Sequence, residues 1–233
     1  MKYKIKKTIP VVLILIGLAL ISLPVSNNFN LKKNMNRVTI DDASPKQLQE
    51  NDATVLPKEY YDFSKVKEIM PTSTFIGSNS VDASLLVGQI VIPSINLNLS
   101  IFKGTTDYNL LAGVTTMKES DKMGKGNYTL AGHYNKDKSI LFGGLMDVKV
   151  GDIIKITDKS NIYEYRVYCA KTVDDSAVDM ISDEKAAERG NSIISLMTCY
   201  FSSKTSKRYF VIGDLVDTYP YKKEKMFLKK RTV

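Results

Sequence analysis

The chain has few residues of the two types that most often support nucleophilic chemistry: one histidine, His133, and two cysteines, Cys169 and Cys199, in 233 residues. Any reaction that needs an imidazole must therefore use His133, although a lone histidine is commonly an ordinary surface or hydrogen-bonded residue. Two cysteines cannot build a disulfide-stapled scaffold, but counting alone leaves a single bridge between them open.

One long apolar run, from Ile9 to Val25, lies at the N-terminus, and the C-terminus has no second one. Its length is near the lower end of the roughly 17 to 25 residues that a helix needs to span a bilayer. The following stretch offers no small-x-small cleavage site and no lipid-bearing cysteine, so we favour a signal anchor over a cleaved signal peptide. The run is preceded by Lys2, Lys4, Lys6 and Lys7. These lysines predict a single-pass protein of the cell membrane with its N-terminus in the cytoplasm and the remainder outside.

Composition divides the chain into four segments. Residues 1–26 are the basic end and transmembrane anchor, 27–84 a polar stalk or linker, 85–218 a β-rich domain, and 219–233 a basic tail. Within the stalk, Ser44 as N-cap with a following proline predicts a helix to about residue 51. A disordered linker is the alternative for the stalk, and a solvated tail is the expectation for the C-terminus.

Short β-rich runs separated by turn residues extend from about Leu86 to about Asp217, with no long amphipathic helix between them. About seven or eight short strands in one span predict a mostly β fold, a closed barrel of about eight strands with short helices in the connections. The expected strands are 88–93, 97–102, 128–131, 153–157, 162–170, 193–198 and 209–216.

Two irregular stretches interrupt these strands, and such loops often form the walls of catalytic sites. In the first, residues 107–117 predict a short helix. In the second, a helix from Asp183 to Arg189 is expected to end at Gly190, just before the strand that carries Cys199.

The two cysteines differ in their surroundings. Cys169 shares one face of its expected strand with Tyr165 and Val167, which predicts a small buried apolar residue. Cys199 ends an apolar strand and precedes a polar loop, which predicts a thiol at a rim. Because a free thiol has a pKa near 8.5, catalysis at neutral pH needs a partner for its proton, and the chain offers only the imidazole of His133. Arg208, at the start of the next strand, is a candidate donor for an oxyanion.

The order of these motifs resembles the sortases, the cell-surface transpeptidases of Gram-positive bacteria. The matching segments are Leu130-Ala131-Gly132-His133, Ser195-Leu196-Met197-Thr198-Cys199, and Arg208 before Val211-Ile212-Gly213-Asp214-Leu215. Each motif is weak alone, but together, in this order and behind an anchor, they are specific. Two segments depart from the family pattern: Ser195 replaces the usual threonine, and Asp174-Asp175-Ser176 stand where many housekeeping members carry a proline.

The resemblance implies a class A (housekeeping) sortase, with classes D and E as neighbours. It implies that the Cys199 thiolate attacks the Thr-Gly carbonyl of an LPXTG-like signal in a surface protein precursor and forms a thioacyl-enzyme. His133, as imidazolium, then protonates the leaving amine, and Arg208 stabilises the oxyanion or positions the substrate. Thr198 and Ala131 would bind substrate, and the acyl acceptor would be an amino group of a lipid II-like peptidoglycan precursor.

Two other classes of function stay open: a membrane-anchored cysteine protease or amidase that transfers the acyl group to water, and a non-catalytic surface β-barrel that binds ligands. No metal or cofactor is expected. Some class A sortases bind calcium through loop carboxylates before the histidine strand, where this chain has Asp107, Glu119 and Asp121. The net charge of +8 alone suggests nucleic acid, but the extracellular orientation and the absence of any nucleic-acid motif argue against it.

Overall fold

The computed structural model describes residues 2–62 and 81–228 of the chain. The described residues form eight strands, which close into a barrel in the order β1-β2-β3-β4-β7-β8-β6-β5. The strands are β1 (Leu86–Ile92), β2 (Leu97–Phe102), β3 (Gly113–Thr116), β4 (Asn127–Ala131), β5 (Ile153–Thr157), β6 (Asn161–Asp174), β7 (Ile193–Cys199) and β8 (Lys207–Pro220). The predicted closed barrel of about eight strands is confirmed.

Two neighbouring pairs, β2 with β3 and β4 with β7, are parallel, and the other pairs are antiparallel. Because parallel strands end at the same edge of a sheet, the residues that follow β4 and β7 emerge side by side. The barrel interior is filled by one apolar cluster that includes Ile90, Leu130, Leu196 and Val211, all fully buried. This packed interior holds the ends of β4 and β7 in place.

The stretch predicted as a helix from 107 to 117 is mostly not helical. Only Asn109–Leu111 forms a 3-10 turn, and the remainder contains strand β3, which pairs with β2. A side chain at Gly113 would put its Cβ 2.3 Å from the Ser100 carbonyl oxygen, so the close approach of β3 to β2 requires glycine. The β-branched Val114 and the two threonines after it also favour a strand over a helix.

Four α-helices are present in the described residues: α1 (Lys2–Met35), α2 (Pro45–Ala53), α4 (Glu184–Arg189) and α5 (Lys223–Phe227). The Ser44 hydroxyl caps α2 by accepting a hydrogen bond from Gln47 N at 3.1 Å, as predicted. Gly190 ends α4 in the left-handed conformation, with φ of 67°, which confirms the second helix prediction.

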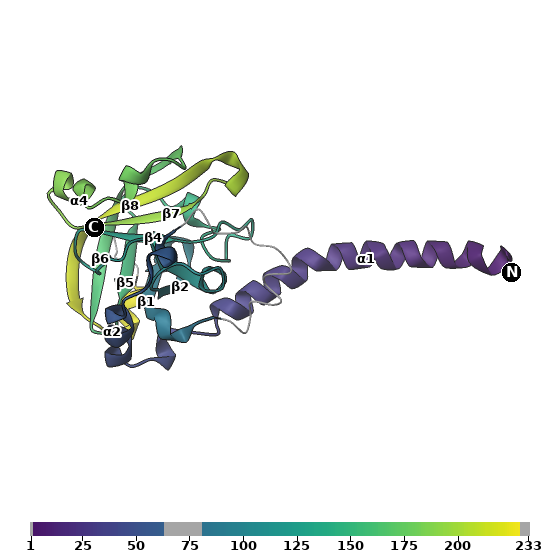
Figure 1. Ribbon diagram of the computed structural model, residues 1–233, viewed down its shortest axis with the longest axis horizontal. Helices are drawn as coiled ribbons and strands as arrows, with labels where there is room; N and C mark the ends of the chain where they lie inside the picture. Colours follow the sequence, from purple (N-terminus) through teal and green to yellow (C-terminus); the bar gives the residue numbers. More distant parts are fainter. Residues whose placement is uncertain (1, 63–80, 229–233) are drawn as a thin grey trace.

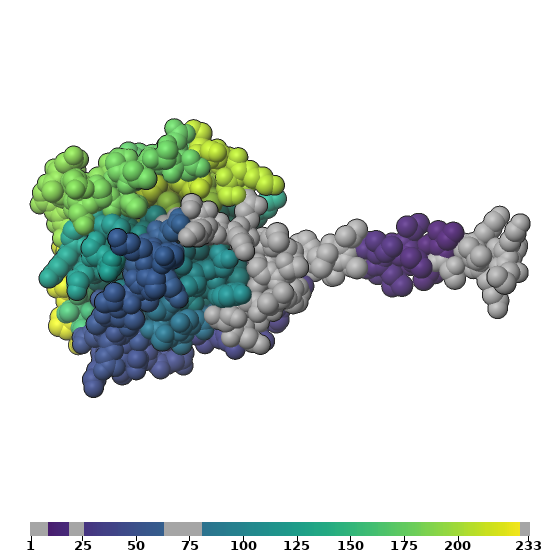
Figure 2. Space-filling model, in the orientation of Figure 1, coloured from purple at the N-terminus to yellow at the C-terminus, as the bar shows by residue number. Residues whose placement is uncertain are grey.

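The helix α1 projects from the barrel as a long rod (Figures 1 and 2). Its final turns are docked, since Leu31 is fully buried in the main core and Lys32 pairs with Asp137 at 3.2 Å. Among the described residues, α1 included, no helix combines the length and the apolar character needed to cross a membrane.

Much of the expected stalk is ordered against the barrel. Leu48 of α2 is fully buried beside Leu86 and Phe102, which belong to β1 and β2. Residues 63–80 of the expected stalk lie outside the described part of the chain. From residue 27 to residue 62, then, the chain packs as part of the folded domain and does not form a disordered linker.

The C-terminal segment is also docked, where we expected a solvated tail. Met226 of α5 is fully buried against Val91 and Ile162. The ammonium of Lys155, on β5, donates to the carbonyl oxygens of Lys225 at 2.6 Å and Leu228 at 3.0 Å. Burial of Met226 and these charge-assisted hydrogen bonds explain why a basic sequence packs on the barrel instead of extending into solvent.

Candidate active site

The register of three adjacent strands brings His133, Cys199 and Arg208 to one edge of the barrel. In the parallel β4–β7 pair, Ala131 lies opposite Met197, and the next bond runs from Gly132 N to Met197 O at 3.0 Å. His133 is two residues beyond Ala131, and Cys199 is two residues beyond Met197. On the other side of β7, Cys199 is paired directly with Arg208 of β8.

The segment after His133 is held by Phe142. The Phe142 backbone N–H donates to the His133 carbonyl oxygen at 3.0 Å. Its fully buried ring lies against Gly132, where a Cβ would be 2.6 Å from Phe142 Cδ2. Glycine before the histidine is therefore a packing requirement, because any larger residue would push the ring or the end of β4 away.

Side chains alternate between the two faces of β7, so Thr198 and Cys199 lie on opposite faces. Ile194 and Leu196 belong to the main core, and Thr198 continues their series with 1% of its surface exposed. Cys199 lies on the opposite face and is partly exposed. Ala131, opposite Met197, is on the Cys199 face. The Thr198 side chain is thus buried on the other face of β7 from Cys199, and substrate binding by Thr198 and Ala131 stays a prediction.

The His133 ring lies in a poorly hydrated environment although the residue remains partly exposed. Desolvation by the surrounding protein lowers the pKa of His133 to about 4, and the negative charge of Asp107 acts in the opposite direction. The imidazole is therefore mostly neutral at pH 7. A neutral ring near Cys199 is able to accept the thiol proton.

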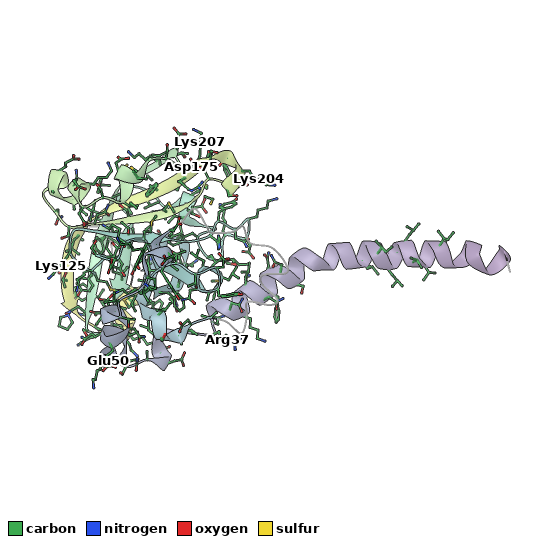
Figure 3. All side chains as sticks on the ribbon, in the orientation of Figure 1. Arg37, Glu50, Lys125, Asp175, Lys204 and Lys207 are labelled. Carbon is green, nitrogen blue, oxygen red and sulfur yellow. The ribbon has the colours of Figure 1, made fainter. Side chains whose placement is uncertain are left out.

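Arg208 contacts the loop that follows β6. Its Nη2 lies 3.8 Å from Asp175 Oδ2, and its Nη1 donates to Lys207 O at 3.1 Å. Asp175 N also donates to Ser206 O at 3.0 Å, so the ends of the β6–β7 and β7–β8 loops are joined at one end of the barrel, where Asp175, Lys204 and Lys207 are labelled (Figure 3). The sequence singled out the unusual Asp175 but gave no sign that it contacts Arg208.

The connection between β6 and β7 is fixed to β4 by polar contacts that sequence reasoning missed. Asn127, at the start of β4, donates through Nδ2 to Met180 O at 3.2 Å and Ser182 O at 3.0 Å. Asp183 Oδ1 accepts from Asn127 N at 2.9 Å and from Lys118 Nζ at 2.8 Å. The strand that leads to His133 therefore also positions this connection.

Of the three loop carboxylates considered for calcium, Asp121 is already engaged by the protein. Asp121 accepts hydrogen bonds from Lys118 N at 2.9 Å and from Thr129 Oγ1 at 2.6 Å. Burial raises the pKa of Asp121 to about 6, although these bonds act to lower it. The Lys118 ammonium lies 3.6 Å from Asp121 and 2.8 Å from Asp183. Within the described residues, no group of three or more His, Cys, Asp or Glu side chains is arranged to hold a metal ion.

Cys169 lies away from this edge and is not disulfide-bonded. A bulge between Val167 and Cys169 inserts an extra residue in β6, so the two side chains fall on opposite faces. Val167 and Tyr165 fill the main core, whereas Cys169 packs beside Met180 in a separate apolar cluster. The expectation that Cys169 shares a face with Tyr165 and Val167 is wrong, because alternation is reset at the bulge.

Comparison with known proteins gives consistent results. The family model described as "Sortase domain" matches residues 90–216. A sortase A of Listeria monocytogenes is 41% identical over 223 residues, covering 94% of this chain and 96% of the relative. A sortase A of Bacillus anthracis is 34% identical over 217 residues, covering 93% of this chain and 97% of the relative. The solved structure of a Listeria monocytogenes sortase A matches with a TM-score of 0.57 and 46% identity, over 63% of this chain and 99% of that one.

The matched family region runs from β1 to β8 and so contains the whole edge on which His133, Cys199 and Arg208 meet. The relatives named sortase A also extend over nearly all of the chain. The chain belongs to the sortase family of cysteine transpeptidases, among the class A sortases.

Proposed function

We propose that this sortase cleaves an LPXTG-like sorting signal between threonine and glycine and joins the surface protein to an amino group of a lipid II-like peptidoglycan precursor. The observation that carries this proposal is the placement of His133 just beyond the end of β4, next to the paired Cys199 of β7 and Arg208 of β8. A thiol, a proton acceptor and a fixed cation at one edge are the groups that acyl transfer through a thioester needs.

In the first half-reaction, the Cys199 thiol transfers its proton to His133, and the thiolate attacks the threonine carbonyl carbon. The lowered pKa of His133 supports this order, because a mostly neutral ring must receive a proton before it can donate one. When the tetrahedral intermediate collapses, the C–N bond breaks, and the imidazolium gives its proton to the departing glycine amine. The product is a thioester between the threonine carbonyl and Cys199.

In the second half-reaction, the acceptor amine attacks the thioester carbonyl and gives up a proton to His133. The C–S bond then breaks, and the released thiolate recovers the proton from the imidazolium. Both tetrahedral intermediates carry an oxyanion, which Arg208 stabilises. Its guanidinium is partly exposed and lies 3.8 Å from Asp175, which supports a cation held at this edge of the barrel.

The same proposal includes a single membrane anchor near the N-terminus, with the barrel outside the cell. Within α1, the apolar side chains from Ile9 to Leu18 are at least half exposed on several sides of the helix. Exposed apolar side chains on a helix favour lipid over water as their surroundings. Fractionation of cells that express the full chain tests this point, since an anchored protein resists carbonate extraction and requires detergent.

We further propose that calcium is not required. The Lys118 ammonium already lies between the carboxylates of Asp121 and Asp183, and so supplies a positive charge between the β3–β4 and β6–β7 connections. Adding calcium or a chelator should leave the rate of peptide cleavage unchanged. A calcium-dependent rise in that rate would contradict this part of the proposal.

The reaction is tested with the purified protein and a fluorogenic LPXTG peptide, with and without a glycine amine or hydroxylamine. We expect cleavage, an amine adduct in the mass spectrum, and no turnover by Cys199→Ala. Cys169→Ala is the matched control and should retain activity, because that thiol packs in a separate cluster. Cleavage without any amine adduct would identify a hydrolase. No cleavage of any LPXTG-type peptide and no modification of Cys199 would refute the proposal.

A further inference from the structure

An aromatic contact joins the two segments that carry His133 and Cys199. In the described residues, the backbone ladder between β4 and β7 ends with the hydrogen bond from Gly132 N to Met197 O. Beyond this bond, the rings of Tyr134 and Phe201 meet edge to face, with their centroids 5.8 Å apart and their planes at 85°. Tyr134 directly follows the histidine, and Phe201 is the second residue after the cysteine.

Phe201 adopts a conformation that is unfavourable for its residue type. Its φ is 60°, in the left-handed region that favours glycine, and 56% of its surface is exposed. Neither the backbone strain nor the exposure of a phenyl ring stabilises the domain by itself. Strain of this kind persists only where neighbouring interactions fix the residue, and it is often found at functional sites.

The turn that presents Phe201 is closed by its own hydrogen bonds. Tyr200 N donates to Lys207 O at 3.1 Å, one step beyond the paired Cys199 and Arg208. The Thr205 hydroxyl donates to Tyr200 O at 2.9 Å. The Tyr200 ring also lies 4.5 Å from the Phe201 ring, centroid to centroid. Phe201 is therefore held in a defined position against Tyr134.

We propose that Tyr134 and Phe201 are positioning residues that form an aromatic clasp and keep the His133 imidazole aligned with the Cys199 thiol. The proposal rests on the proposed function, in which these two groups exchange a proton. Such a transfer requires hydrogen-bonding distance, and β4 gives no backbone support beyond Gly132. The hydrogen bond from Phe142 N to the His133 carbonyl oxygen fixes the histidine to its own loop and not to the strand of Cys199.

The test is steady-state kinetics of LPXTG peptide cleavage by the full chain in detergent. Phe201→Ala should lower kcat about two- to tenfold, the usual value of one aromatic pair, and leave the KM for peptide unchanged. Tyr134→Ala should have the same effect, and the double variant should be no slower than either single variant. Phe201→Tyr keeps the ring and should restore kcat. Lys204→Ala, an exposed side chain of the same turn, is the control (Figure 3).

A higher KM with unchanged kcat in Phe201→Ala would overturn the clasp and make Phe201 a substrate contact. If the fold-decreases in kcat of the two single alanine variants multiply in the double variant, the clasp is also overturned, because the two rings would then act independently. Thermal unfolding identifies any loss of folding, and in that case Phe201→Leu, which keeps apolar bulk without a ring, must still show the lower kcat. Wild-type kcat in Phe201→Ala refutes the clasp alone, whereas an inactive wild-type enzyme refutes the proposed function as well.

Discussion

Replacing Gly132 by alanine should damage both the stability of the domain and its activity. The new Cβ would lie 2.6 Å and 2.9 Å from Cδ2 and Cγ of Phe142, and 3.0 Å from Cγ1 of Val114. Carbon atoms in contact are ordinarily about 3.5–4.0 Å apart, so the overlap is close to 1 Å. The Phe142 ring is fully buried, so it cannot move aside into solvent. Overpacking of this kind costs about 1–3 kcal/mol.

For a domain of this size, that cost lowers Tm by about 2–12 °C. Because Phe142 N also binds the His133 carbonyl oxygen, movement of the ring moves the histidine. A shift of about 1 Å at a catalytic group can cost up to a hundredfold in rate, so we expect kcat/KM for peptide cleavage to fall about ten- to a hundredfold. Thermal unfolding and the peptide assay measure the two effects separately.

The double variant Gly132→Ala/Phe142→Leu provides the control. Leucine at position 142 removes the ring atoms that the new Cβ of Gly132→Ala would meet. The double variant should therefore lose less free energy of unfolding than the two single variants lose in sum. Strict additivity would show that the Cβ does not meet Phe142. A Gly132→Ala variant with the Tm and the peptide cleavage rate of the wild type would refute the role assigned to the contact between Gly132 and Phe142.

Three further predictions concern other parts of the domain. Lys118→Met should lower the free energy of unfolding by about 1–3 kcal/mol in urea titrations, because it leaves the buried Asp121 and the partly exposed Asp183 without their cation. Since the folded pKa of His133 is about 4 and the unfolded value about 6.5, protonation below pH 6.5 favours the unfolded chain. Stability should therefore fall between pH 6.5 and 4 more steeply in the wild type than in His133→Gln. Met226→Ala should cost about 2–5 kcal/mol in thermal unfolding while kcat for peptide cleavage stays unchanged, because Met226 is fully buried in an apolar cluster apart from the catalytic edge.

Much of the barrel could be predicted from local pattern. The strands Leu97–Phe102 and Ile153–Thr157 have the predicted bounds, because each alternates and is bordered by turn residues. The strand Gly113–Thr116 could not be recognised in this way. It has only four residues, all of them buried, so it has no solvent-exposed face and shows no alternation of apolar and polar residues. Its identity depends on pairing with β2, which is a non-local interaction.

The faces of the longest strands were harder to predict than their existence. A single bulge in β6 places Cys169 on the opposite face from Val167, and nothing local in the sequence marks that bulge. Glu164 illustrates the same limit, since strict alternation next to Tyr165 would place it on the polar face of the strand. The structure buries it, with 1% of its surface exposed, beneath the C-terminal segment, where it accepts a hydrogen bond from Tyr219 at 3.0 Å. Burial of this side chain depends on a segment that is more than fifty residues away in the sequence.

The candidate site shows which part of an active site a sequence can identify. Cys199 and Arg208 are close in sequence, and a hairpin is enough to bring them together. His133 reaches them only because β4 and β7 are parallel, and parallel pairing is set by the whole barrel. The contact between Asp175 and Arg208 cannot be read from local sequence, because it depends on how two loops meet. Asp175 also belongs to the segment in which this chain departs from the family pattern.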